Sequence, residues 1–166
     1  MQSKNLELII SQLEDLTLSL FPEILKIYED KDFKTRHKKD GSPVTKADML
    51  GHKLILKFLN KHYPDIPIVS EESFTQKGYK PAKEFWLVDP IDGTKSFISG
   101  NPVWATLIAL VIGDEVVLSV VSAPAMQQRW WASREAGAFT RNNSGQQRLS
   151  VSTTPDLVNA ALIFSP

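Results

Sequence analysis

Two aspartates stand three residues apart in the segment WLVDPIDGTKSF, residues 86–97. Asp89 ends an apolar, strand-like run, Pro90 bends the chain away, and Asp92 follows one short turn later. We therefore expect the two carboxylates to converge, with the main-chain carbonyl of Ile91 between them. Clustered hard oxygens without His or Cys favour Mg²⁺, which keeps several waters and is commonly completed by a substrate phosphate.

Gly93 and Thr94 follow at the start of a predicted short helix, residues 94–99. The first N–H groups of a helix are unpaired and lie at the positive end of its dipole, so they attract anions. Gly93 permits close approach of the backbone to such an anion. A metal beside a helix start indicates a phosphate site where water attacks phosphorus. Taken singly, these residues are also ordinary turn and cap choices, and Asp92 alone could be a helix N-cap.

Three further acidic residues belong to the pattern. Glu71 and Glu72 follow the strand-like run IPIVS, residues 66–70, where adjacent acids are usually a solvated loop. Thr45 reads as a helix N-cap with Asp48 three residues on, which is a variant of the capping box. A helix start can face a site, so the capping role of Asp48 does not exclude a role in chemistry.

The order of three segments carries a family resemblance. KKDGSPVTKAD, residues 38–48, then VSEES, residues 69–73, then residues 86–97 resemble the motifs of the inositol-monophosphatase superfamily of Mg²⁺-dependent, lithium-sensitive phosphatases. The resemblance covers nearly the whole chain. It implies two or three Mg²⁺ ions, inhibition by Li⁺, a small phosphorylated substrate and a possible homodimer. By the same resemblance the metal ligands would be Glu71, Asp89, Asp92 and the carbonyl of Ile91.

The resemblance also implies roles in catalysis. Gly93 and Thr94 would hold the phosphate, while Thr94, Glu71 and Asp48 would position and deprotonate the attacking water. Lys38 matches the family's lysine ahead of that aspartate, near the active-site loop. Taken alone, a lysine in this basic run is as readily a solvated charge.

Two later segments point to one branch of the superfamily. GNPVWATLIAL, residues 100–110, and VVSAPAMQQRWWASREAGAF, residues 120–139, resemble the histidinol-phosphatase branch. This implies hydrolysis of L-histidinol phosphate to histidinol and phosphate, a step of histidine biosynthesis. An inositol monophosphatase or a 3'(2'),5'-bisphosphate nucleotidase is the alternative within the class, and Trp130 and Trp131 could be aromatic strand packing instead.

The composition of the sequence limits which binding partners and which cellular compartment are expected. Nineteen basic residues balance nineteen acidic ones, and no basic block suggests nucleic acid or a membrane surface as partner. Cysteine is absent, which fits a reducing compartment, so we expect a cytoplasmic protein. The longest uncharged apolar run, residues 103–112, is half of the roughly 20 residues needed to span a bilayer.

The elements that must position these residues follow from hydrophobic spacing. Apolar residues from Leu6 to Leu20 recur at three- and four-residue steps, which predicts a helix that meets Pro22 near its end. A second helix follows Thr45 and stops before Pro64. From Ile66 onward, short β-prone runs predict a sheet, with a hairpin turn at Gly113-Asp114 and another near residues 143–145.

The expected fold class is α+β. Two long helices pack on a mainly antiparallel sheet in a layered, sugar-phosphatase-type N-terminal domain. The strands around the turn at residues 113–114 are apolar at nearly every position, so both faces of the sheet should be covered.

The expected domains are residues 1–155, which bind metal and phosphate, and residues 156–166, which start a truncated second α/β domain. The strand-like run LVNAALIFSP, residues 157–166, belongs to that second part. By the resemblance, the second domain would supply a further metal ligand in a Trp-Asp motif that is absent here. A different class is therefore also considered: a truncated, non-catalytic remnant or assembly module.

Overall fold

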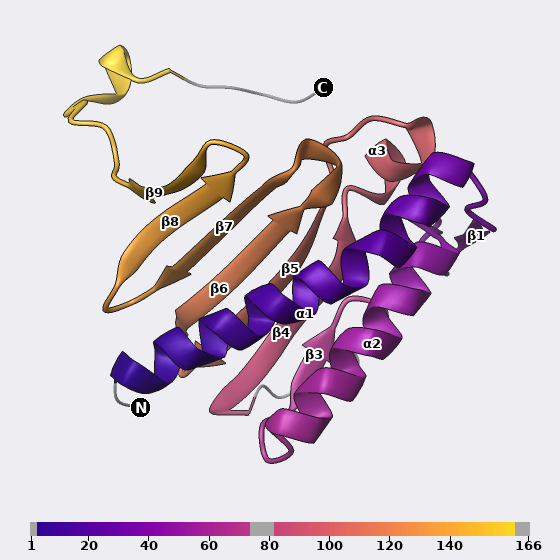
Figure 1. Cartoon of the computed structure of the whole chain (residues 1–166), viewed down its shortest axis with the longest axis horizontal. Coiled ribbons are helices and arrows are strands. Elements are labelled where there is room, and N and C mark those ends of the chain that lie inside the picture. The colour runs from indigo at the N-terminus through magenta and orange to yellow at the C-terminus, as the bar shows by residue number, and fades with distance from the viewer. Residues whose placement is uncertain (1–2, 74–81, 162–166) are drawn as a thin grey trace.

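A computed structural model describes residues 3–73 and 82–161 (Figure 1). Its helices and strands are α1 (Ser3–Asp30), β1 (Arg36–His37), β2 (Pro43–Val44), α2 (Lys46–His62), β3 (Ile68–Ser70), β4 (Glu84–Asp92), α3 (Thr94–Ser99), β5 (Ala105–Ile112), β6 (Glu115–Ala123), β7 (Gln128–Ser133), β8 (Gly137–Asn142) and β9 (Gly145–Leu149). Two short 3₁₀ turns lie at Pro124–Met126 and Leu157–Asn159.

Seven strands form one sheet whose order follows the sequence, from β3 at one edge to β9 at the other. Among the strands of the described residues, only β3 and β4 pair in parallel, and the other neighbouring pairs of this sheet are antiparallel. The predicted hairpins are confirmed, because Ile112 pairs with Glu115 across one turn and Asn142 pairs with Gly145 across the other. Helices α1 and α2 lie across the same face of this sheet (Figure 1). The predicted α+β class is therefore confirmed.

Helix α1 is longer than the sequence predicted. It continues through Pro22 to Asp30 instead of ending near the proline. Proline removes one intrahelical hydrogen bond and crowds the preceding turn. Beyond it, however, Ile24 and Ile27 continue the buried stripe of the helix. Their burial against the rest of the core offsets the local cost, so packing overrides the helix-breaking tendency.

Helix α2 begins as predicted. The Thr45 hydroxyl accepts a hydrogen bond from the Ala47 N–H at 3.1 Å, and the Asp48 carboxylate accepts one from the Thr45 N–H at 2.7 Å. This reciprocal capping box fixes the first turn. The helix ends at His62, before Pro64.

Strand β4 does not end at Asp89 as predicted. It continues to Asp92, with a register shift against β5 between the two aspartates. Pro90 lies inside this irregularity, where a residue without an N–H is tolerated because the regular ladder is interrupted. The Thr106 hydroxyl holds the segment by donating to the Pro90 carbonyl at 2.8 Å. Both aspartates are thus carried by one kinked strand.

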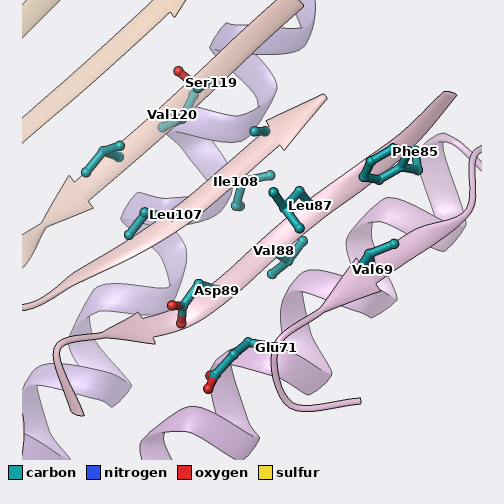
Figure 2. A pocket seen from close by; sticks show the side chains of 12 residues that line it. Val69, Glu71, Phe85, Leu87, Val88, Asp89, Leu107, Ile108, Ser119 and Val120 are labelled. Atoms are coloured by element: carbon teal, nitrogen blue, oxygen red, sulfur yellow. The ribbon is translucent and has the colours of Figure 1, made fainter. Parts of the chain in front are cut away.

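Helices cover only one face of the sheet in the described part of the chain. Val88 faces them and is 1% exposed, whereas Leu87, on the opposite face, is 45% exposed. The opposite face forms an apolar groove of about 560 Å³ whose lining includes Phe85, Leu87 and Leu107 (Figure 2). We expected both faces to be covered. In the described part of the chain, helices cover one face and the other face is open.

The C-terminal run differs from the strand expected there. Residues 150–161 contain no strand, and Leu157–Asn159 form a 3₁₀ turn with exposed side chains. The rest of the predicted run, residues 162–166, lies outside the described residues. The predicted division into domains at residues 155 and 156 stays a prediction.

Neighbouring substitutions on the two faces of β4 test this arrangement. We expect Val88→Ala to lower the free energy of unfolding by roughly 1–3 kcal/mol, because it leaves a cavity in the core. Leu87→Ala should cost less than about 1 kcal/mol, because its side chain already meets water. Denaturant unfolding of the 166-residue chain measures both. Equal costs would mean that the groove face is covered after all.

Candidate active site

The parallel pairing of β3 with β4 brings Glu71 beside Asp89. Ser70 is paired with Val88, and the Glu71 N–H donates to the Val88 carbonyl at 3.0 Å. Glu71 follows Ser70 and Asp89 follows Val88, so the two acids lie at the same end of the paired strands. Figure 2 shows both carboxylates at the same end of the apolar groove.

The kinked part of β4 carries the other predicted ligands. The Ile91 N–H donates to Asp89 Oδ1 at 3.1 Å, so the carboxylate folds back over its own strand. Asp92 is exposed and is the last residue of the strand. The helix cap that follows is Gly93, without a side-chain hydrogen bond, so Asp92 is not the N-cap of α3.

Gly93 is required by the backbone at this turn. Its φ is +84°, and a Cβ there would lie 3.0 Å from the Val103 carbonyl oxygen. The next residue, Thr94, opens α3. Phe97 anchors that short helix in the core, with its ring centroid 5.3 Å from that of Tyr28 and 4.8 Å from that of Trp104. The start of α3 is thus held rigidly by aromatic packing.

Asp48 joins the site from α2. Its side chain is fully buried, and Oδ2 accepts from the Thr45 N–H and the Thr45 hydroxyl, the latter at 2.5 Å. Oδ1 lies 3.2 Å from Thr94 Oγ1, which also lies 3.0 Å from the Ile91 carbonyl oxygen. Burial raises the pKa of Asp48, while hydrogen bonds from Thr45 and Thr94 oppose the shift. One carboxylate therefore caps a helix and faces Thr94.

Lys38 contacts two acids of this cluster. Its Nζ lies 2.6 Å from Glu71 Oε1 and 3.0 Å from Glu72 Oε1. Burial acts to lower the pKa of Lys38, but these hydrogen bonds outweigh it and the pKa is raised. The alternative of a solvated charge is therefore wrong for Lys38.

Glu72 was expected, with Glu71, in a solvated loop, and the sequence assigned it no role in the site. Its side chain is 3% exposed, against 46% for Glu71. Burial first, and then hydrogen bonding to Glu71, raise the pKa of Glu72 to about 7, although Lys38 opposes the shift. Both acids lie in the turn at residues 71–73 and both contact Lys38, so their different exposure comes from tertiary packing around the turn. No spacing in the sequence signalled that difference.

The electrostatics of the cluster centre on Asp89. Burial raises the pKa of Asp89 to about 6, and the charges of Glu71, Asp92 and Asp48 add to the shift. Crowded hard-oxygen carboxylates are a donor set that suits a divalent cation. Within residues 3–73 and 82–161, however, no three acidic or His side chains are placed to hold one ion. The residue types fit Mg²⁺, but the coordination by Glu71, Asp89, Asp92 and the Ile91 carbonyl stays a prediction.

Carboxylates gathered at a strand end beside a helix start are residue types that suit a metal ion and a phosphate. The chain belongs to the inositol monophosphatase family, whose sequence model matches residues 5–165.

The relatives include two enzymes called histidinol-phosphatase. That of Mycobacterium tuberculosis is 43% identical over 138 residues, covering 81% of this chain and 51% of its own. That of Streptomyces coelicolor is 42% identical over 139 residues, with the same coverages. A 3'(2'),5'-bisphosphate nucleotidase of Haemophilus influenzae is 34% identical, covering 78% of this chain and 49% of its own.

A solved structure supports the same family. The IMPase of Thermotoga maritima superposes with a TM-score of 0.67 at 28% identity, covering 86% of this chain and 55% of that one. The chain thus spans about half the length of the curated relatives it matches. None of the helices in the described part of the chain combines the length and apolarity that a bilayer crossing needs.

The raised pKa values predict how stability depends on pH without metal. A carboxyl whose folded pKa exceeds its unfolded value stabilises the fold below the unfolded pKa, and this contribution is lost as pH rises through the folded pKa. Stability should therefore fall from about pH 4 to 6 through Asp89, and on to about pH 7 through Glu72. In Asp89→Asn the first part of this fall should disappear.

Thermal unfolding at several pH values measures the difference. Relative to the wild type, Asp89→Asn should gain on the order of 1 kcal/mol between pH 4 and 6, discounted because the group is partly exposed. Asp114→Asn, in the exposed β5–β6 turn, is the matched control and should gain nothing over this range. Parallel pH curves for all three proteins would refute the crowding of charge at Asp89.

Proposed function

We propose that this chain is the metal- and phosphate-binding part of a Mg²⁺-dependent phosphomonoesterase whose favoured substrate is L-histidinol phosphate. The carrying observation is the crowding of carboxylates around Asp89, which raises its pKa to about 6 through burial and the charges of Glu71, Asp92 and Asp48. A divalent cation would relieve that repulsion and prefers these oxygen ligands.

Glu71, Asp89 and Asp92 would hold the metal ions, with the Ile91 carbonyl as a further oxygen ligand. Bound Mg²⁺ would lower the pKa of a coordinated water and stabilise charge on the phosphate oxygens. A third ion, and inhibition by Li⁺, are expected from family membership.

The proposed proton path uses the contact between Thr94 and Asp48. Water attacking phosphorus would give its proton to Thr94 Oγ1, while the hydroxyl proton of Thr94 passes to Asp48 Oδ1, 3.2 Å away. The ester P–O bond would break as the new P–O bond forms, and the leaving alkoxide would take a proton from solvent, which gives the alcohol and phosphate. Burial raises the pKa of Asp48, which makes its carboxylate a stronger base. The phosphate would lie at the first N–H groups of α3, beside Gly93.

The choice of substrate is supported by the two histidinol-phosphatases, which are 43% and 42% identical over four fifths of this chain. The runners-up are an inositol phosphate and a 3'(2'),5'-bisphosphate nucleotide, because relatives with both kinds of name occur. We place the reaction in the cytoplasm, since a chain without cysteine suits a reducing compartment.

A role of another class is favoured by one observation. The apolar groove behind Asp89 is uncovered in the described chain, and the matched relatives are about twice as long. The 166 residues could therefore act as a non-catalytic assembly module, or as one part of an enzyme that needs a second part. An activity assay separates these roles.

Phosphate release from histidinol phosphate, inositol monophosphate and a 3',5'-bisphosphate nucleotide tests the proposal. We expect turnover of histidinol phosphate with Mg²⁺, none with EDTA, and a reduced rate with Li⁺. If the 166-residue chain is inactive, a longer chain that includes these residues and the length its relatives have is assayed in the same way.

In the active protein, Asp89→Asn and Glu71→Gln should lower kcat by at least about a hundredfold, because each removes a charged ligand. Asp114→Asn, far from the cluster in sequence and exposed, should leave kcat unchanged. Near-wild-type rates for Asp89→Asn would exclude the proposed metal role.

A further inference from the structure

Helix α2 contributes one residue to the candidate site and contacts two of its strands. It contributes Asp48 itself. One turn later, Gly51 packs so closely on Pro90 that a Cβ there would lie 3.2 Å from the Pro90 Cβ. The next residue, His52, places Nδ1 2.8 Å from Ser70 Oγ, at the end of β3. The helix thus spans the strand that carries Asp89 and the strand that precedes Glu71.

We propose that His52 is a positioning residue that fixes Glu71 beside Asp89 by holding the hydroxyl of Ser70. The inference rests on the proposed function for its consequence in metal binding. Its structural part stands on the contacts of His52 and Ser70 alone.

Ser70 is well placed to transmit such a constraint. It is the last residue of β3 and is fully buried, and the contact with His52 is the hydrogen bond of its side chain. The adjoining peptide is bound on the other side, where the Glu71 N–H donates to the Val88 carbonyl. The backbone at Glu71 is therefore held by the sheet on one side and by α2 on the other.

Strand register makes this constraint important. β3 is three residues long and lies at the edge of the sheet, so few ladder hydrogen bonds define its alignment with β4. Val69 and Glu71 line the groove, as Figure 2 shows, while Ser70 between them meets α2. A slip by one residue would reverse every side chain. It would turn Glu71 toward α2 and bring Ser70 to the groove.

His52 can fix the register because its bond is specific to one alignment. After a slip, Ser70 would face the groove and its hydroxyl could not reach α2. In the slipped register Val69 or Glu71 would take the place of Ser70: Val69 has no polar side-chain atom to meet Nδ1, and Glu71 would have to bury a longer, charged side chain there. His52 is itself only partly buried, so replacing it opens no large cavity in the core. A defect at Glu71 would thus be separable from general loss of stability.

The test compares four variants of the chain: His52→Leu, His52→Asn, Ser70→Ala and the control His62→Leu. Asn can place a polar atom close to the position of Nδ1, whereas Leu cannot. His62 lies on the same helix, is exposed, and stacks on Phe58 away from Ser70. Two quantities are measured: hydrogen exchange of the Glu71 amide by NMR, and the Kd for Mg²⁺ by calorimetry.

We expect His52→Leu and Ser70→Ala to speed exchange of the Glu71 amide and to weaken Mg²⁺ binding by roughly tenfold, the lower range for supporting partners of metal ligands. Exchange in the central strand β5 should stay unchanged. His52→Asn should restore most of both effects, and His62→Leu should show neither. Combining His52→Leu with Ser70→Ala should add nothing, because the two changes remove one bond.

Wild-type exchange at Glu71 in His52→Leu would overturn the inference. Equal damage in His52→Leu and His52→Asn, or faster exchange throughout β5, would also overturn it, since the effect would then be general loosening. If the wild-type chain binds no Mg²⁺ but His52→Leu still frees the Glu71 amide, the positioning role stands. The proposed metal site in this chain would then be wrong.

Discussion

The parallel pairing of β3 with β4 is the constraint on which the candidate site depends. All other strand pairs are antiparallel neighbours in sequence, and most are joined by short turns that define them locally. The pair β3–β4 instead runs in parallel and aligns the carboxyl ends of the two strands, so Glu71 meets Asp89. Because β3 is short, this alignment also relies on α2, which contacts both strands.

The cost of this arrangement is electrostatic. The carboxylates of Asp89, Glu71, Asp92 and Asp48 lie near one another, and burial makes their mutual repulsion stronger than it would be in water. Lys38 contacts Glu71 from this group, and also Glu72. Such crowding destabilises a fold unless a positive charge relieves it. The raised pKa values of Asp89 and Glu72 are therefore more informative about function than the acidic residues alone.

The two faces of the sheet differ in a way that bears on the proposed activity. One face forms a complete core with α1 and α2, whereas the groove face ends at Glu71 and Asp89 without a covering layer among the described residues. Carboxylates at the rim of an open groove stay partly hydrated, which weakens electrostatic interactions. A covering layer would strengthen these interactions, so the chemistry of the acidic cluster depends on what covers the groove.

Local sequence patterns determined much of the fold and of the site. The capping box of Thr45 and Asp48, the helix start at Thr94 and the hairpin turns depend on residues close in sequence, so their patterns predicted them. Tertiary structure decided the rest. Core packing carried α1 through Pro22, the kink kept Pro90 within β4, and distant contacts buried Glu72 and joined His52 to Ser70. Those outcomes depend on segments that meet only after folding, and no local spacing encodes the energy of such contacts.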